Sequence, residues 1–115
     1  MKVLVCGGRD FADHRWFSEV MEELWREAGE LVVVHGGARG ADSLARAFAA
    51  RHGLPCLVYR AGWDRYGKRA GPLRNQRMLD EAKPDLVVAF PGGRGTADTV
   101  ARALRAGVPV RMPAR

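Results

Sequence analysis

The chain has 115 residues and a formal net charge of +6, and 47% of its residues are hydrophobic. This length fits one domain over residues 1–115, and the composition excludes an intrinsically disordered chain. The apolar runs of about five residues are too short to span a bilayer and the N-terminus has no signal-peptide pattern, so we expect a cytoplasmic protein without a membrane partner.

The first half of the chain alternates apolar runs rich in β-branched residues with patterns typical of amphipathic helices. Asp13 predicts the start of a helix, because its side chain can accept a hydrogen bond from the first turn, and Gly29 predicts the end. The elements predicted here are a strand over Lys2–Cys6, a helix between Asp13 and Gly29, a strand over Leu31–His35, a helix over Gly40–His52 and a strand over Pro55–Tyr59.

The second half continues the alternation after a loop of about a dozen residues. Pro72 suits the start of a helix, because the N–H group that proline lacks has no intrahelical partner there, and Pro84 ends this helix. The elements predicted here are a helix over Pro72–Ala82, a strand over Asp85–Phe90, a helix over Thr96–Ala106 and a strand over Val108–Met112.

Five strands that alternate with four helices predict an α/β fold. The strands are continuously apolar, which indicates a parallel sheet that is covered on both faces. Right-handed crossovers then give a three-layer, doubly wound, Rossmann-like domain, for which we predict the strand order 3-2-1-4-5. In this order the switch point lies between the first and fourth strands, and a ligand is expected beyond the carboxyl ends of the strands.

Glycine pairs follow three of the predicted strands, at this same edge of the sheet. Glycine allows the backbone to approach a ligand closely, and the start of the next helix adds free N–H groups, so these loops predict a phosphate site. The candidates are Gly7, Gly8 and Arg9 after the first strand, Gly36, Gly37, Arg39 and Gly40 after the second, and Pro91, Gly92, Gly93, Arg94, Gly95 and Thr96 after the fourth. Asp42 is a further candidate, although its position favours a role in starting the helix over that of a catalytic acid.

The stretch GWDRYGKRAGPLRN, over Gly62–Asn75, begins with a near match to a P-loop. The match ends in Arg69, where a P-loop has a Ser or Thr that binds Mg²⁺, so we predict no triphosphate site of this kind. Trp63 could stack on a base or could anchor the loop. Arg74 and Asn75 open the next predicted helix, where they could contact a ligand or could be a surface arginine and a capping asparagine.

The sequence predicts no metal and no cofactor. Its two cysteines and three histidines match no metal-binding spacing, and the G-x-G-x-x-G fingerprint of dinucleotide-binding proteins is absent. Basic residues are concentrated between Arg60 and Arg77, against the single acid Asp64. This stretch is either a solvated face or an anion site for the phosphates of a small ligand or of a nucleic acid.

Four segments together resemble the SLOG superfamily, and in particular its YspA, cpYpsA-related branch of small single-domain proteins. They are CGGRDF, VVHGGARGADSLA, WDRYGKRAGPLRNQRM and FPGGRGTAD, and the resemblance runs from Lys2 to about Val110. More distant relatives include the Lonely Guy phosphoribohydrolases and the DNA-processing DprA proteins. The resemblance implies a Rossmann-like domain for a nucleotide or a nucleotide-derived ligand, which some members sense and others cleave.

The resemblance to the Lonely Guy enzymes also implies a catalytic pair. Their P-G-G-x-G-T turn is followed by one residue and a glutamate, and Asp98 takes that place here. Arg74 takes the place of an arginine that opens an earlier helix in those enzymes. Because aspartate is one methylene shorter than glutamate, the class of ligand carries over better than the reaction.

Three functions therefore stay open at this point. The chain is a binder or sensor of a nucleotide-like small molecule, or it is a phosphoribohydrolase that cleaves nucleoside 5′-monophosphates with Arg74 and Asp98. Binding of single-stranded nucleic acid is the third function, and it rests on the basic stretch and the similarity to DprA. Related proteins often pair through helices beside the pocket, so we expect a homodimer.

Overall fold

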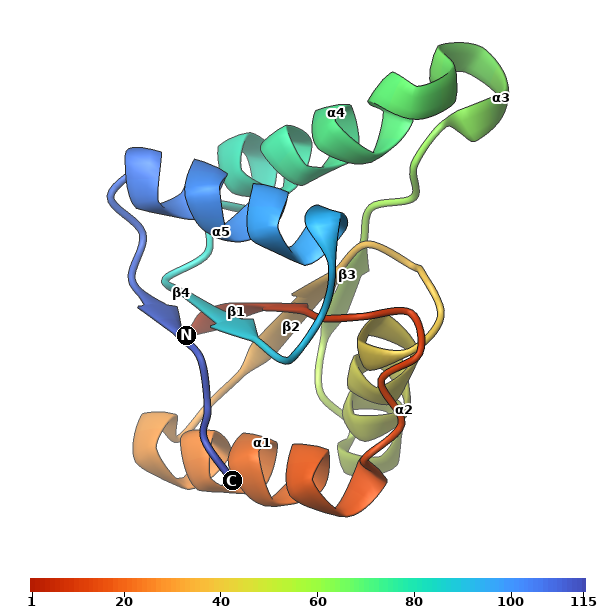
Figure 1. Ribbon diagram of the computed structural model, residues 1–115. Helices are drawn as coiled ribbons and strands as arrows, with labels where there is room; N and C mark the ends of the chain where they lie inside the picture. Colours follow the sequence, from red (N-terminus) through yellow and green to blue (C-terminus); the bar gives the residue numbers. More distant parts are fainter.

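Five parallel strands form the central sheet of the structure, a computed structural model that describes residues 1–115 (Figure 1). Their order, β3-β2-β1-β4-β5, confirms the predicted order. The strands are β1 (Lys2–Cys6), β2 (Val32–His35), β3 (Cys56–Val58), β4 (Leu86–Ala89) and β5 (Val110–Arg111). All but β1 are one to three residues shorter than predicted, although backbone hydrogen bonds to the neighbouring strand continue at Tyr59 and Phe90.

Helices cover both faces of the sheet, which confirms the doubly wound Rossmann-like architecture (Figure 1). One face carries α1 (His14–Ala28) and α2 (Ala41–His52), and the other carries α4 (Ala70–Arg77) and α5 (Arg94–Arg105). The Asp13 side chain accepts a hydrogen bond from the Trp16 N–H at 3.1 Å, as expected for a residue that starts α1.

Alternate residues of β1 pack into two separate hydrophobic clusters, one on each face of the sheet. Val3 and Val5 belong to the cluster under α1 and α2, whereas Leu4 belongs to the cluster under α5 and the helical residues Met78–Ala82. In the first cluster the ring centroids of Phe17 and Phe90 are 4.8 Å apart. All of these side chains are almost fully buried, so the central strands are fixed from both sides.

The segment from Trp63 to Arg69 is helical, so the prediction of a long loop before Pro72 was wrong. It forms a short helix, α3 (Trp63–Tyr66), and a 3-10 turn, η1 (Gly67–Arg69), which lead directly into α4. The Tyr66 N–H donates to the Gly62 carbonyl oxygen at 2.9 Å, and the Trp63 ring packs against Gly71 of α4. These contacts stabilise a helical segment whose polar sequence shows no pattern typical of a helix.

The helix boundaries in the second half of the chain also differ from the prediction. The helix around Pro72 begins at Ala70 and is followed by a π-helical turn, η2 (Met78–Ala82), so Pro72 lies in the first turn but is not its first residue. The last helix, α5, begins at Arg94 and ends at Arg105, whereas Thr96–Ala106 was predicted. Its earlier start places Gly95 and Thr96 inside the first turn.

None of the helices combines the length and the apolar character that crossing a membrane would require.

Gly40 holds the start of α2 against the loop that follows β1. Its φ is +78°, and a Cβ atom at this position would overlap the Gly8 carbonyl oxygen, to which the Ala41 N–H donates at 3.2 Å. Gly107 has a similar φ of +75°, but a Cβ atom there would meet nothing within 4 Å. Gly40 also has a ψ of −127°, outside the left-handed helical region, so replacing Gly40 combines backbone strain with steric overlap, whereas replacing Gly107 introduces strain without overlap.

We expect Gly107→Ala to lower the free energy of unfolding by about 1–2 kcal/mol through strain alone. Gly40→Ala should cost about 1–3 kcal/mol more, because the loop after β1 must also move. Urea denaturation of both variants measures the difference. Equal losses would show that the contact of Gly40 with Gly8 does not contribute to the fold.

Candidate functional site

A cavity of about 660 Å³ lies at the carboxyl edge of the sheet, between the loops that follow β1 and β2 and the helices α3, α4 and α5. Of the residues proposed from sequence, those that line it are Gly7, Gly8, Arg9, Gly36, Asp42, Trp63, Arg74, Asn75, Gly93, Arg94, Gly95, Thr96 and Asp98. Segments far apart in the sequence thus meet at one site. The position is that of the ligand crevice in doubly wound sheets.

The N-terminus of α5 opens into this cavity. Gly93 is the N-cap residue, no side chain caps the helix, and the first intrahelical bond runs from the Ala97 N–H to the Gly93 carbonyl oxygen at 3.1 Å. The N–H groups of the residues between them, Arg94, Gly95 and Thr96, therefore have no intrahelical partner. Three free N–H groups and the positive end of the helix dipole favour an anion at this position.

Two candidate residues from the loop after β4 shape the wall instead of lining the cavity. The Gly8 N–H donates to the Pro91 carbonyl oxygen at 2.8 Å, which ties the loop after β1 to the loop after β4. A Cβ atom on Gly92 would overlap the Thr96 hydroxyl and would lie 2.6 Å from the Gly8 nitrogen. Only glycine allows the two loops to approach so closely.

Three other candidates from sequence lie away from this cavity. Gly37 and Arg39 line a second, smaller cavity next to it, and Gly40 lies where α2 meets the loop after β1. The Arg39 side chain is largely exposed and forms an ion pair with Asp10 at 3.4 Å.

Arg74 joins the loop after β2 to α4. Its Nη1 donates to the Gly36 carbonyl oxygen at 2.7 Å, and its Nε donates to Asn75 Oδ1 at 2.8 Å. A Cβ atom on Gly36 would collide with this guanidinium, so a glycine is required here for close approach. Arg74 and Asn75 lie inside α4 and do not open it, so the reading of Asn75 as a cap was wrong.

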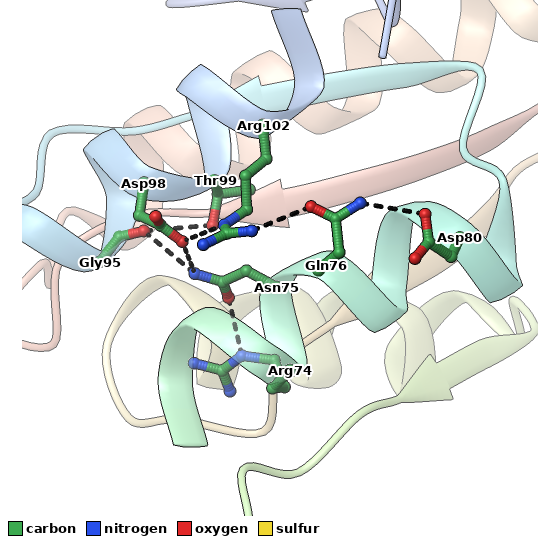
Figure 2. Close-up of polar contacts among 8 residues, drawn as sticks. All are labelled: Arg74, Asn75, Gln76, Asp80, Gly95, Asp98, Thr99 and Arg102. Carbon is green, nitrogen blue, oxygen red and sulfur yellow. Dashed lines mark hydrogen bonds and ion pairs between the residues drawn. The ribbon is translucent and has the colours of Figure 1, made fainter. Parts of the chain in front are cut away.

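Asn75 is the centre of a polar network between α4 and α5 (Figure 2). The side chain is only 3% exposed, and its Nδ2 donates to Asp98 Oδ2 at 3.0 Å. The same Asp98 oxygen accepts a hydrogen bond from Arg102 Nε at 2.8 Å, and Arg102 Nη1 in turn donates to Gln76 Oε1 at 3.0 Å. The amide of Asn75 thus connects Arg74 with Asp98.

The Asp98 carboxylate is held in its ionised form. Partial burial acts to raise its pKa, but the hydrogen bonds from Asn75 and Arg102 and the positive charges of Arg102 and Arg105 outweigh this effect, so that the pKa lies below its usual value. A carboxylate of this kind can stabilise positive charge at neutral pH, but it has no proton to donate as a general acid.

Asp42 is a second carboxylate on the cavity wall, and its environment is different. Burial raises its pKa above the usual value, although the hydrogen bonds from the N–H groups of Ala38 and Gly36 and the charges of Arg74 and Arg9 act in the opposite direction. Its Oδ2 accepts the Ala38 N–H at 3.2 Å, so this aspartate both closes the loop before α2 and faces the cavity.

Sequence reasoning missed several polar residues of the site, among them Lys68, Thr99 and Arg102. Lys68 lies in η1 and lines the cavity. The partial P-loop match included this lysine, but we did not take it as evidence for a site. Arg102 lies one helical turn after Asp98, and the i, i+4 spacing of opposite charges on α5 could have indicated this ion pair.

A family model described as the YspA, cpYpsA-related SLOG family matches residues 1–66. The gene 61 protein of Mycobacterium phage D29 is 41% identical over 117 aligned positions, which cover 95% of this chain and 93% of that protein. The chain belongs to the YspA, cpYpsA-related SLOG family. Membership of this SLOG family indicates a nucleotide-related ligand as the general class that the chain binds.

The matched segment of the SLOG family model ends at Tyr66 in α3. It therefore includes the glycine loops after β1 and β2, whereas the α4–α5 network with Asn75 and Asp98 lies beyond it. The assignment of α4 and α5 to the cavity wall comes from the structure.

His35, at the end of β2, supports the loop that carries Gly36 and Gly37. Its Nδ1 accepts the Gly37 N–H at 3.0 Å, and its buried Nε2 has no hydrogen-bond partner. Burial lowers the pKa of His35 to about 4, assisted by the positive charges of Arg46, Arg60 and Arg74. The imidazole is therefore neutral at physiological pH and acts as an acceptor.

Acid should destabilise the protein through His35. Below pH 6.5 the unfolded chain binds a proton that the folded chain does not, so the free energy of unfolding falls as the pH falls, until the folded histidine itself titrates near pH 4. His35→Asn, which keeps an acceptor for the Gly37 N–H, should flatten the pH profile by up to about 1.4 kcal/mol per unit. Urea denaturation between pH 6.5 and 4 compares the slopes, and parallel profiles would contradict this role.

Proposed function

We propose that this SLOG protein binds a nucleotide with its phosphate at the N-terminus of α5. The observation that carries the proposal is the uncapped helix start at Gly93–Thr96, which opens into a cavity of about 660 Å³. The N–H groups there suit phosphate oxygens, and the volume lies within the range of about 300–1,000 Å³ that small-molecule sites occupy. Arg9, Lys68, Arg74 and Arg94 also line the cavity, so its charge favours an anion.

The base of the nucleotide would lie on Trp63. This side chain is 47% exposed on the cavity wall, and the Arg9 guanidinium lies over its ring with 5.5 Å between the guanidinium carbon and the ring centroid. An exposed indole offers a stacking surface that does not depend on the identity of the base. Asp42 would accept hydrogen bonds from sugar hydroxyls or from the amino group of a base.

Substitutions at Gly93, the N-cap residue of α5, can distinguish an effect on stability from an effect on phosphate binding. A Cβ atom on Gly93 meets nothing within 4 Å, so side chains fit there without displacing neighbours. Gly93→Asp should keep or raise the melting temperature, since aspartate is a good N-cap residue, but its charge should repel the phosphate. We expect this variant to bind nucleoside 5′-monophosphates at least about tenfold more weakly than the matched Gly93→Asn variant.

Calorimetric titration at constant salt measures both affinities, and the unphosphorylated nucleoside is the control. Equal affinity of Gly93→Asp and Gly93→Asn for the monophosphate would contradict a phosphate at this position.

Cleavage of the N-glycosidic bond is a second candidate function for the same site, and Asp98 is the observation that favours it. Its ionised carboxylate lines the cavity one turn after the start of α5, where it could stabilise the oxocarbenium-like charge that develops on a ribose. Arg74, linked to Asp98 through Asn75, would hold the phosphate or the leaving base. The Arg102 ion pair already offsets part of the Asp98 charge, so we rank binding first.

The hydrolase candidate predicts free base when the wild-type protein is incubated with nucleoside 5′-monophosphates. Asp98→Asn should lower that rate by at least about a hundredfold, because the stabilising charge is lost while the shape of the side chain is kept. Chromatography of the reaction mixture detects the base. If the wild-type protein binds the nucleotide but releases no base, the hydrolase candidate is wrong and binding alone stands.

A further inference from the structure

A second cavity of about 380 Å³ adjoins the proposed phosphate cavity and differs from it in charge. Four arginines line it, Arg9, Arg39, Arg60 and Arg74, and no Asp or Glu does. The main cavity, by contrast, carries Asp42 and Asp98 on its wall. The second cavity is therefore the more strongly positive of the two, although the helix N-terminus that suits the first phosphate does not reach it.

The two cavities share one wall, formed by Gly36, Arg9, Trp63 and Arg74 together with Ala38. Arg39 and Arg60 line only the second cavity, whereas Gly93 to Thr96 line only the first. An anion held by the arginine pair is thus separate from an anion held by α5. A ligand that reaches both would lie along this shared wall.

The arginines of the second cavity have donors to spare. Arg60 makes one long contact, from Nη1 to the Gly37 carbonyl oxygen at 3.5 Å, and Arg39 makes one exposed ion pair with Asp10 at 3.4 Å. Exposed pairs of this kind contribute little, so Arg39 is free to turn toward an anion. Arg74 uses Nε and one N–H of Nη1 in its two bonds, which leaves three of the five guanidinium donors.

We propose that the natural ligand is a nucleotide with a second, separate anionic group, such as a nucleotide that is phosphorylated at two positions. Its first phosphate lies at α5, its second anionic group lies between Arg39 and Arg60, and Arg9 and Arg74 contact the part between them. This inference rests on the proposed nucleotide site and specifies the class of ligand. A simple mononucleotide would leave the second cavity without a partner.

Three ligands and two variants test the proposal at constant salt. The ligands are a nucleoside 5′-monophosphate, the corresponding 3′,5′-bisphosphate and a dinucleoside 5′,5′-diphosphate. The double variant Arg39→Gln/Arg60→Gln removes the charges that belong only to the second cavity. Arg15→Gln is the matched control, because Arg15 is an exposed arginine of α1 whose side chain is 92% exposed.

The wild-type protein should bind the 3′,5′-bisphosphate at least tenfold more tightly than the monophosphate. The double variant should lose most of this preference, with a loss in affinity for the bisphosphate that exceeds its loss for the monophosphate by at least tenfold. Arg15→Gln should keep the wild-type affinities. A larger gain with the dinucleoside 5′,5′-diphosphate, whose two phosphates are adjacent, would contradict two separate anion subsites.

Other outcomes overturn the inference in distinguishable ways. If the monophosphate binds and neither two-anion ligand gains affinity, the second subsite is wrong and the proposed nucleotide site stands. If no nucleotide binds, both are wrong. If a single-stranded oligonucleotide binds more tightly than any of the three ligands, with a steep salt dependence that the double variant reduces, the arginines serve a nucleic-acid backbone instead.

Discussion

The parallel pairing of β1 with β4 is the constraint on which the rest of the structure depends. Cys6 pairs with Ala89 at the carboxyl end of this ladder, and the Phe90 N–H donates to the Cys6 carbonyl oxygen at 2.9 Å. The chain then leaves the two strands toward opposite faces, to α1 from β1 and to α5 from β4 (Figure 1). The gap between them exposes backbone N–H groups to the cavity, so the pairing that builds the core also creates the proposed anion site.

The loops at this edge are held by contacts that only small residues permit. Gly8, Gly36, Gly40 and Gly92 each lie where a side chain would meet another loop or Arg74. Several glycines of the family motifs therefore serve to bring the loops together. The free N–H groups of α5 face the cavity because these close approaches hold the loops in place.

On the α4 side the site depends on one buried amide. Asn75 presents its oxygen to Arg74 and its nitrogen to Asp98, so that the positions of a cation on α4 and an anion on α5 are coupled. The buried polar groups of this network all have hydrogen-bond partners only while every member is present, so the loss of one residue leaves others without partners. Whether the ligand is only bound or also cleaved, this network sets where the charge of Asp98 lies.

Much of the architecture could be predicted from the sequence. The spacing of apolar residues and the glycines between them indicate where strands and helices begin and end. The strand order and the meeting of three glycine loops follow from them, and the motif resemblance pointed to Asp98 and Arg74. The helical segment at Trp63–Arg69 could not be predicted, since it depends on contact between Trp63 and Gly71. The role of Asn75 was equally out of reach, because its partner lies 23 residues away on another helix.

The central claim, that α5 holds a phosphate, can be tested directly by the amide nitrogen–proton NMR spectrum of the protein during titration with a nucleoside 5′-monophosphate. The account predicts that the largest shifts occur at the amides of Arg94, Gly95 and Thr96, and that the unphosphorylated nucleoside does not produce them. Saturable binding of the monophosphate that leaves these three amides unchanged would contradict it.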